Sequence, residues 1–218
     1  MIGVVIAMQS EADILLDEMQ ISRSLTVSGK KVHVGKAYGK DIALCVCGVG
    51  KVNAALGSQL LVSKFDAEKL LNFGVSGGLN KSTKLCQVYQ IEAATQFDFD
   101  LVQLNGTKIG TLNEYTEPYL ALNQLALPYE KRKLATADRF NDSADDYNLL
   151  TKELSADIRD MEGGAIVQAA YAASLPVYSI KAISDVAGSG STTEQFLVNK
   201  DRALANLKAE LPRIFEQL

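Results

Sequence analysis

The stretch IGVVIAMQSEADILLDEM, residues 2–19, contains the pattern on which the fold depends. It begins with a run of mostly β-branched and apolar residues, Ile2–Met8, which predicts a buried strand. The residues that follow, Ser10–Met19, place apolar side chains at helical spacing, and Ser10 and Asp13 stand at the separation of a capping box. A buried strand therefore leads directly into an amphipathic helix.

The same alternation continues to the end of the chain. Further strands are expected in Lys31–Gly48 (two strands that turn at Tyr38–Lys40), Lys69–Gly78, Gln87–Asp100, Lys133–Asp138 and Pro176–Asp185. Helices are expected in Lys51–Phe65, Asp142–Leu154, Glu162–Ser174 and from about Thr192 onward, where Pro212 should kink or end the last turns. This order predicts an α/β fold with helices on both faces of a mostly parallel or mixed sheet. Because strands outnumber helices, the sheet is expected to curl or partly close.

Composition favours one continuous domain over residues 1–218, since 47% of the residues are hydrophobic and no polar low-complexity tract interrupts them. The net charge of −4 and the lack of dense basic runs argue against nucleic acid or an anionic membrane as a partner. No apolar run approaches the ~20 residues of a membrane span. Three cysteines without a disulfide pattern favour a cytoplasmic protein, and a single histidine, His33, argues against a histidine-based metal site. No cofactor motif is present.

Four polar features follow strands, and three of them have ordinary structural explanations. Glu11 could complement the dipole of its helix, and Asp185 could cap a helix or form a turn. The glycine-rich stretch FGVSGG, Phe73–Gly78, could be a tight turn, and it lacks the Lys-Ser/Thr ending of a phosphate loop. Its backbone N–H groups and the Ser76 hydroxyl could equally approach a ligand.

Glu162 is the fourth feature, and it precedes Gly163 and Gly164 in DMEGGAIVQAAY. The two glycines indicate close backbone packing, so a buried carboxylate is expected there, and it needs hydrogen-bond donors. Two explanations remain open: Glu162 caps its own helix, or it binds vicinal hydroxyls of a ribose. Since all four features follow strands that should be central, we expect them to meet at one edge of the sheet.

The motifs IAMQSEADIL, CGVGKVNAALG, FGVSGGL, ADRF, DMEGGAI and KAISDVA occur in the order, and with roughly the spacing, found in one enzyme family. The chain resembles the 5′-methylthioadenosine/S-adenosylhomocysteine nucleosidases of the purine nucleoside phosphorylase superfamily over nearly its whole length. The resemblance implies a three-layer, nucleoside phosphorylase-like αβα fold with a twisted, partly closed mixed sheet. It also implies hydrolysis of the N-glycosidic bond to adenine without metal or cofactor, by a homodimer.

The resemblance also implies roles for individual residues. Glu11 matches the carboxylate that orients and deprotonates the attacking water, and Asp185 matches the acid that protonates the purine at N7. Met161 and Glu162 match the pair that contacts the ribose. The remaining substrate-binding positions implied are Val75, Ser76, Phe140 (which stacks on the base), Asn141 (whose backbone reads adenine) and Ser184.

Some positions depart from the family pattern. Lys181 stands where the family commonly has arginine before AISD, and Gly188 replaces an acidic residue. The segment QFDFD lacks the usual histidine, and Leu101–Pro128, which in relatives lines the 5′ end of the pocket, is poorly matched. The preferred 5′ substituent is therefore left open.

Three alternatives to this activity remain open. A nucleoside phosphorylase would need basic residues around a phosphate, whereas AMQSEAD offers Glu11 and no arginine. A nucleoside-binding protein without activity is disfavoured by the three carboxylates, although Lys181 and Gly188 leave it open. A hydrolase of another purine nucleoside, such as one with a bulky 5′ group, is the third.

Overall fold

A computed structural model describes residues 1–79, 82–140 and 142–218 of the chain. The strands it contains are β1 (Ile2–Ile6), β2 (Gln20–Val27), β3 (Lys30–Ala37), β4 (Lys40–Val46), β5 (Lys69–Gly78), β6 (Val88–Gln96), β7 (Leu120–Ala121), β8 (Lys131–Thr136), β9 (Ile158–Asp160) and β10 (Val177–Val186). The helices are α1 (Gln9–Leu16), α2 (Lys51–Phe65), α3 (Val102–Asn105), α4 (Ala144–Asn148), the π-helix η1 (Leu149–Glu153), α5 (Gly163–Ala172) and α6 (Thr192–Glu216). The expected alternation of strands and helices is confirmed.

The strands of the described chain form one mixed sheet in the order β10-β6-β8-β9-β5-β1-β4-β3-β2, with β7 beside β6. Because β10 also pairs with β5, the strands β5, β10, β6, β8 and β9 close into a ring, from which β1, β4, β3 and β2 extend. The prediction of a partly closed mixed sheet is confirmed.

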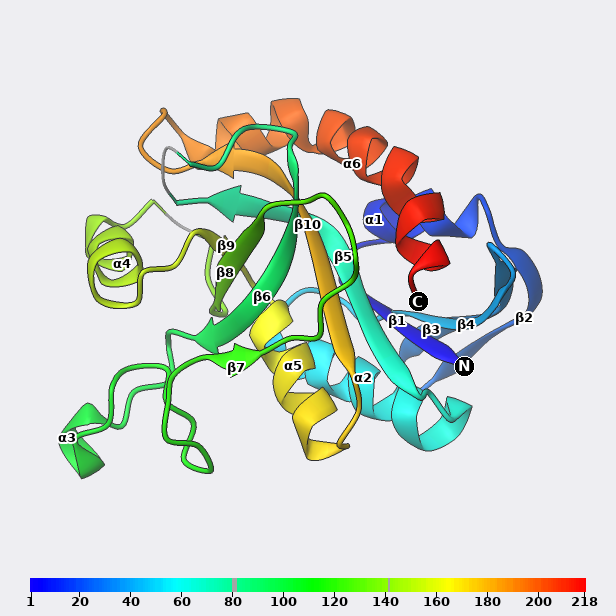
Figure 1. The fold of residues 1–218 in the computed structure, drawn as a ribbon, viewed down its shortest axis with the longest axis horizontal. Coiled ribbons are helices and arrows are strands. Elements are labelled where there is room, and N and C mark those ends of the chain that lie inside the picture. Colours follow the sequence, from blue (N-terminus) through cyan, green and yellow to red (C-terminus); the bar gives the residue numbers. More distant parts are fainter. Residues whose placement is uncertain (80–81, 141) are drawn as a thin grey trace.

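The side chains of β1 show how helices cover both faces of this sheet. Val4 and Ile6 are fully buried in a cluster that includes residues of α1 and α6. Val5, which points to the opposite face, is buried among residues of α2 and α5. Figure 1 shows α1 and α6 on one side of the strands and α2 and α5 on the other. A β-branched run without polar interruptions suits a strand buried on both faces, where each such side chain contributes about 1.5–3 kcal/mol.

Helices α1 and α6 differ from the sequence prediction at their ends. Helix α1 begins at Gln9, not Ser10, and its first turn is closed by the Glu11 carboxylate, which accepts a hydrogen bond from the Met8 backbone N–H at 3.1 Å. The expected Ser10–Asp13 capping pair is therefore wrong. Pro212 does not end α6, which continues to Glu216 and buries Ile214 and Phe215 beyond it.

Other predicted segments are shorter or divided. Strand β6 ends at Gln96, so the following FDFD lies outside it. The helix expected over Asp142–Leu154 is split into α4 and η1. Within the described residues, no helix is both long and apolar enough to cross a membrane.

Three parallel neighbours place the polar groups at one edge of the sheet. Strand β5 pairs in parallel with β1 on one side and with β10 on the other. Their carboxyl ends therefore meet at the same edge of the sheet. At this edge β1 is followed by Glu11, β5 ends in the FGVSGG stretch, and β10 carries Asp185. The expected meeting of these groups is confirmed.

Candidate active site

A cavity of about 350 Å³ opens at this edge of the sheet, and we call it the rim cavity. Most of its wall is apolar, with a few charged groups among the lining residues. Its lining residues are Ala7, Met8, Glu11, Val49, Val75, Ser76, Gly77, Phe140, Arg159, Asp160, Met161, Glu162, Ser184, Asp185, Thr193, Phe196 and Leu197. An apolar cavity with a few convergent polar groups is the usual form of a small-molecule site.

Glu11 is fixed by two backbone N–H groups. Its Oε2 accepts from Met8 at 3.1 Å, and its Oε1 accepts from Val75 at 2.9 Å. Burial raises the pKa of Glu11, while the charge of Lys181 and these two hydrogen bonds lower it, and the net direction is upward. Gly74 is required for this arrangement, because a Cβ at that position would lie 2.3 Å from Glu11 Oε1.

Asp185 lies on β10, where the strand has an irregularity. The register against β5 shifts between Ile183 and Asp185, so Ser184 is an extra residue in the strand. The Ser184 hydroxyl donates to Asp185 Oδ2 at 2.9 Å, while Oδ1 is buried without a hydrogen-bond partner in the described chain. Burial raises the pKa of Asp185, opposed by the Ser184 hydrogen bond and the charge of Arg159. A carboxyl group in this setting favours the protonated form more than a solvated aspartate does.

Glu162 lies directly before α5, but it does not cap that helix. The carboxylate of Asp160 accepts the backbone N–H of Gly163 at 3.0 Å, whereas the Glu162 side chain makes no capping hydrogen bond within the part of the chain that the structure describes. Glu162 Oε1 instead accepts from the Gly50 backbone N–H at 2.8 Å. The capping explanation for Glu162 is therefore wrong.

The position of Glu162 has an electrostatic consequence. Burial, with a smaller contribution from the charge of Asp160, raises the pKa of Glu162 to about 7.

The predicted close packing of the backbone after Glu162 is confirmed. A Cβ on Gly163 would clash with Leu134 Cδ2, and one on Gly164 would lie 2.9 Å from Gln96 Cγ.

Lys181 supplies the positive charge among these carboxylates. Its Nζ lies 3.0 Å from Asp160 Oδ2, and both side chains are only 3% exposed. Burial lowers the pKa of Lys181, but the charges of Asp160, Glu11 and Glu162 outweigh it and the net direction is upward. A charged, buried lysine is therefore held beside Asp160, and it partly offsets the mutual repulsion of the carboxylates.

The structure places the other predicted binding residues as follows. Val75, Ser76, Phe140, Met161 and Ser184 all line the rim cavity. The Ser76 hydroxyl is buried without a hydrogen-bond partner in the described chain, and the Phe140 ring is 48% exposed. The predicted role of Asn141 lies outside the described residues.

Several lining residues were not predicted from the sequence. Phe196 of α6 meets Phe140 edge-on, with ring centroids 5.9 Å apart, and the adjacent Leu197 is 71% exposed. An apolar pair at the start of an otherwise charged helix was the available signal. Arg159 also lines the cavity, and its only signal was a basic residue two positions before Met161.

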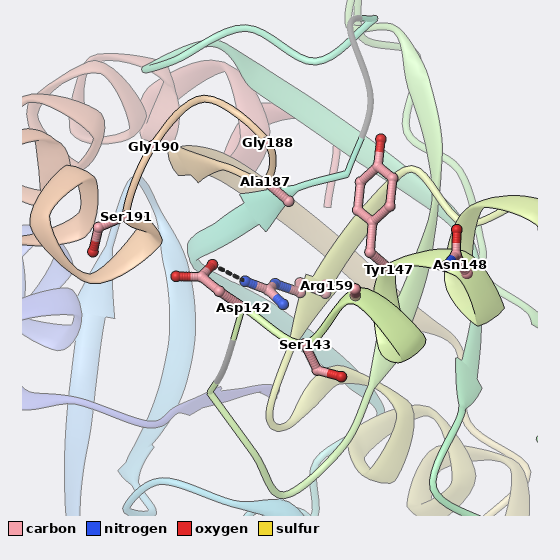
Figure 2. Close-up of a pocket in the computed structure, with 10 residues that line it drawn as sticks. Asp142, Ser143, Tyr147, Asn148, Arg159, Ala187, Gly188, Gly190 and Ser191 are labelled. Atoms are coloured by element: carbon pink, nitrogen blue, oxygen red, sulfur yellow. Dashed lines mark ion pairs between the residues drawn. The ribbon is translucent and has the colours of Figure 1, made fainter.

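The departures from the family pattern lie in different places. Lys181 is not among the described lining residues of the rim cavity, but it forms an ion pair with Asp160, which does line it. Gly188 instead lines a neighbouring cavity of about 450 Å³, which we call the side cavity. Figure 2 shows the residues that line the side cavity, among them Gly188, Arg159 and Asp142. In the FDFD segment, Asp98 pairs with Lys51. No part of Leu101–Pro128 is among the described lining residues of the rim cavity.

Comparison with known proteins places this chain in a family. A model of the phosphorylase superfamily matches residues 1–216, so the chain belongs to that superfamily. It is similar to the 5′-methylthioadenosine/S-adenosylhomocysteine nucleosidase of Listeria monocytogenes serovar 1/2a, at 27% identity over 88% of each chain. It is likewise similar to the protein of that name from Bacillus thuringiensis, at 28% identity over 100% of this chain and 99% of the relative.

Solved structures agree on the fold. The futalosine hydrolase of Helicobacter pylori superposes with a TM-score of 0.91 at 21% identity, covering 100% of this chain and 97% of the other. The 5′-methylthioadenosine/S-adenosylhomocysteine nucleosidase of Neisseria meningitidis, solved with methylthio-immucillin-A, gives a TM-score of 0.90 at 23% identity, covering 100% and 99%. The expected nucleoside phosphorylase-like fold is confirmed.

Proposed function

We propose that this protein hydrolyses the N-glycosidic bond of 5′-methylthioadenosine or S-adenosylhomocysteine-type nucleosides and releases adenine. The observation that carries the proposal is that Glu11 and Asp185, contributed by different elements, are both buried in the wall of one cavity. The similarity to proteins named as 5′-methylthioadenosine/S-adenosylhomocysteine nucleosidases supports it.

The leaving base requires a proton, and Asp185 is the proposed donor. Its raised pKa favours the protonated carboxyl, and its unpartnered Oδ1 is free to face purine N7. Protonation at N7 lets the C1′–N9 electron pair leave with the base as a neutral purine. General acid assistance of this kind typically gives about 10²–10⁴-fold.

Glu11 is the proposed base that readies the attacking water. Hydrogen bonds from Met8 and Val75 hold both of its oxygens, and the charge of Lys181 favours its ionised form. As C1′–N9 breaks, the water oxygen forms the new bond to C1′ and its proton passes to Glu11. The negative charges nearby also stabilise the oxocarbenium-like ribose of the transition state.

Glu162 and Met161 are the proposed ribose contacts. One Glu162 oxygen is already held by the Gly50 N–H, which leaves the carboxylate further acceptor positions for ribose hydroxyls. Phe140 and Phe196 both line the rim cavity, and a base is proposed to stack on an aromatic side chain there. Val75, Ser76 and Ser184 complete the wall, and Asn141 is proposed to read the base through its backbone.

Phosphorolysis is the nearest alternative to hydrolysis, and an assay with and without phosphate distinguishes the two reactions. A buried carboxylate at Glu11 repels a phosphate dianion, so hydrolysis is favoured. We expect release of free base from methylthioadenosine and adenosylhomocysteine at the same rate with and without phosphate. Base release that requires phosphate would assign a phosphorylase instead, and tight adenine binding without turnover would assign a binding protein.

The assembly and location are also proposals. Val49, which lines the rim cavity, and Val52 and Leu56 of α2 are exposed large apolar residues. We propose that a second copy of the chain covers this face in a cytoplasmic homodimer that binds neither nucleic acid nor membrane. Analytical ultracentrifugation should give the mass of a dimer, and Val52→Glu should shift it toward the monomer. A monomeric wild-type protein would contradict the proposal.

A further inference from the structure

Residues 47–50 connect β4 to α2 and reach the proposed ribose contact. The Gly50 backbone N–H donates to Glu162 Oε1 at 2.8 Å, and the adjacent Val49 lines the rim cavity. Gly48 and Gly50 both have positive φ angles, of 93° and 101°. Because glycine populates positive and negative φ about equally well, this loop has little conformational preference of its own. Contacts from outside the loop must therefore fix the Gly50 N–H.

Two side chains hold the carbonyl groups of this loop. The Lys30 ammonium, at the start of β3, donates to the Cys47 backbone oxygen at 2.6 Å. The Asn53 amide, in the first turn of α2, donates through Nδ2 to the Val49 backbone oxygen at 2.7 Å. The carbonyl directly before Gly50 and the one two residues earlier are therefore tied to two different elements of the fold.

These two side chains also fix each other. Lys30 Nζ donates to Asn53 Oδ1. Since an ammonium has donors and no acceptor, the amide oxygen must face it, which turns Nδ2 toward the carbonyl of Val49. The amide also packs on the loop, because a Cβ added to Gly48 would lie 3.3 Å from Asn53 Nδ2. We call Lys30 and Asn53 the loop tether.

The loop acts on Glu162 through the Gly50 N–H. Burial and the charge of Asp160 raise the pKa of Glu162 to about 7, and the Gly50 hydrogen bond opposes this rise. The other charges that act on Glu162 are those of Lys181 and Glu11, and they also lie outside the loop. A displaced loop would therefore change both the orientation of the Glu162 carboxylate and its affinity for a proton.

We propose that Lys30 and Asn53 are positioning residues for ribose binding, which fix the loop so that the Gly50 N–H orients Glu162 toward the ribose hydroxyls. Neither side chain is among the described lining residues of the rim cavity, so both act through the loop. This inference rests on the proposed function, since it assigns Glu162 to the ribose. Small displacements matter here, because a shift of about 1 Å in a substrate-positioning group can cost about 100-fold in rate.

The test compares substrates that differ only in their ribose hydroxyls, 5′-methylthioadenosine and its 2′-deoxy and 3′-deoxy counterparts. The readout is the ratio of kcat/KM for the ribose substrate to that for each deoxy substrate, which cancels a general loss of activity. The variants are Asn53→Ala, which places a strong helix former in α2, and Lys30→Met, which keeps an unbranched apolar stem. Gln217→Ala and Lys31→Met, both at exposed positions, are the matched controls.

In Asn53→Ala the ratio should fall by about 3- to 10-fold for at least one deoxy substrate, as for the loss of one hydrogen bond. Lys30→Met should change the ratio in the same direction, and the two controls should leave it unchanged. An unchanged ratio in Asn53→Ala overturns the inference but leaves the nucleosidase intact.

A second measurement needs neither substrate nor turnover. The pKa of the Glu162 carboxyl is followed by carbon NMR in the ligand-free wild-type protein and in Asn53→Ala, with Glu162→Gln to assign the signal. Loss of the Gly50 hydrogen bond should raise this pKa above its wild-type value of about 7, whereas no change or a decrease overturns the inference. A protein that releases no base would refute the proposed function, and the NMR measurement would still decide whether the loop tether orients Glu162.

Discussion

Glu162→Gln tests the electrostatic description of the site through stability, without any substrate. The ordinary pKa of this carboxyl is 4.5, and burial raises it to about 7 in the folded protein. A raised pKa means that the folded state binds the proton more tightly than the unfolded state does. Its stabilising contribution is complete below about pH 4.5 and is lost as the pH rises through about 7.

The size of this effect follows from the shift. Each pKa unit corresponds to about 1.4 kcal/mol, so the folded protein loses about 3 kcal/mol across this pH range through Glu162. Glutamine keeps an oxygen for the Gly50 N–H and carries no charge at any pH. The unfolding free energy of Glu162→Gln, relative to wild type, should therefore rise by about 3 kcal/mol between about pH 4.5 and pH 8.

The assay is urea unfolding of the ligand-free protein at several pH values, with Glu216→Gln as control. Glu216 is exposed at the end of α6, and its removal should change stability by no more than about 0.5 kcal/mol at any pH. A stability difference for Glu162→Gln that stays flat with pH, or that falls as pH rises, would refute the claim that burial raises this pKa.

The remaining predictions concern catalysis and assume the proposed activity. Asp185→Asn removes the proton donor and should lower kcat by roughly 10²–10⁴-fold while substrate binding, measured by calorimetry, is retained; near-normal turnover would exclude Asp185 as the acid. Glu11→Gln should lower kcat to a similar degree, and full activity would mean that another group prepares the water. Gly74→Ala should lower kcat by at least about 10-fold although residue 74 does not contact substrate, because the added Cβ would clash with Glu11 Oε1 and push the carboxylate out of position. Unchanged rates in this variant would show that the position of Glu11 is unimportant.

Much of the fold was predictable because it depends on local patterns. The run at Ile2–Met8 and the helical spacing after it predicted β1 and α1, and Lys51–Phe65 was predicted with the bounds that α2 has. Three strands were not predicted: the eight-residue β2, and the short β7 and β9, in which two or three residues carry no periodicity. The two short segments are strands only because neighbouring strands pair with them.

Pro212 shows how tertiary packing can continue a helix past a residue that locally favours its end. Proline disfavours a helix interior, and the sequence predicted a kink or an end at this position. The helix continues past it, since Leu211, Ile214 and Phe215 are buried there against the sheet. Burial of large apolar side chains, at about 1.5–3 kcal/mol each, outweighs the loss of one helical hydrogen bond.

The sequence by itself determined which groups were available: three carboxylates and a glycine-rich stretch at the ends of central strands, in an order that marks a family. Tertiary structure alone decided what holds them. The Gly50 N–H on Glu162 joins residues 112 positions apart, and Lys181 reaches Asp160 from another strand. It also decided that Asp160, not Glu162, caps α5, and that Arg159 lies beside Asp185. Hydrogen bonds and charge interactions depend on distance through space, which strand pairing and register set and which spacing along the chain does not reveal.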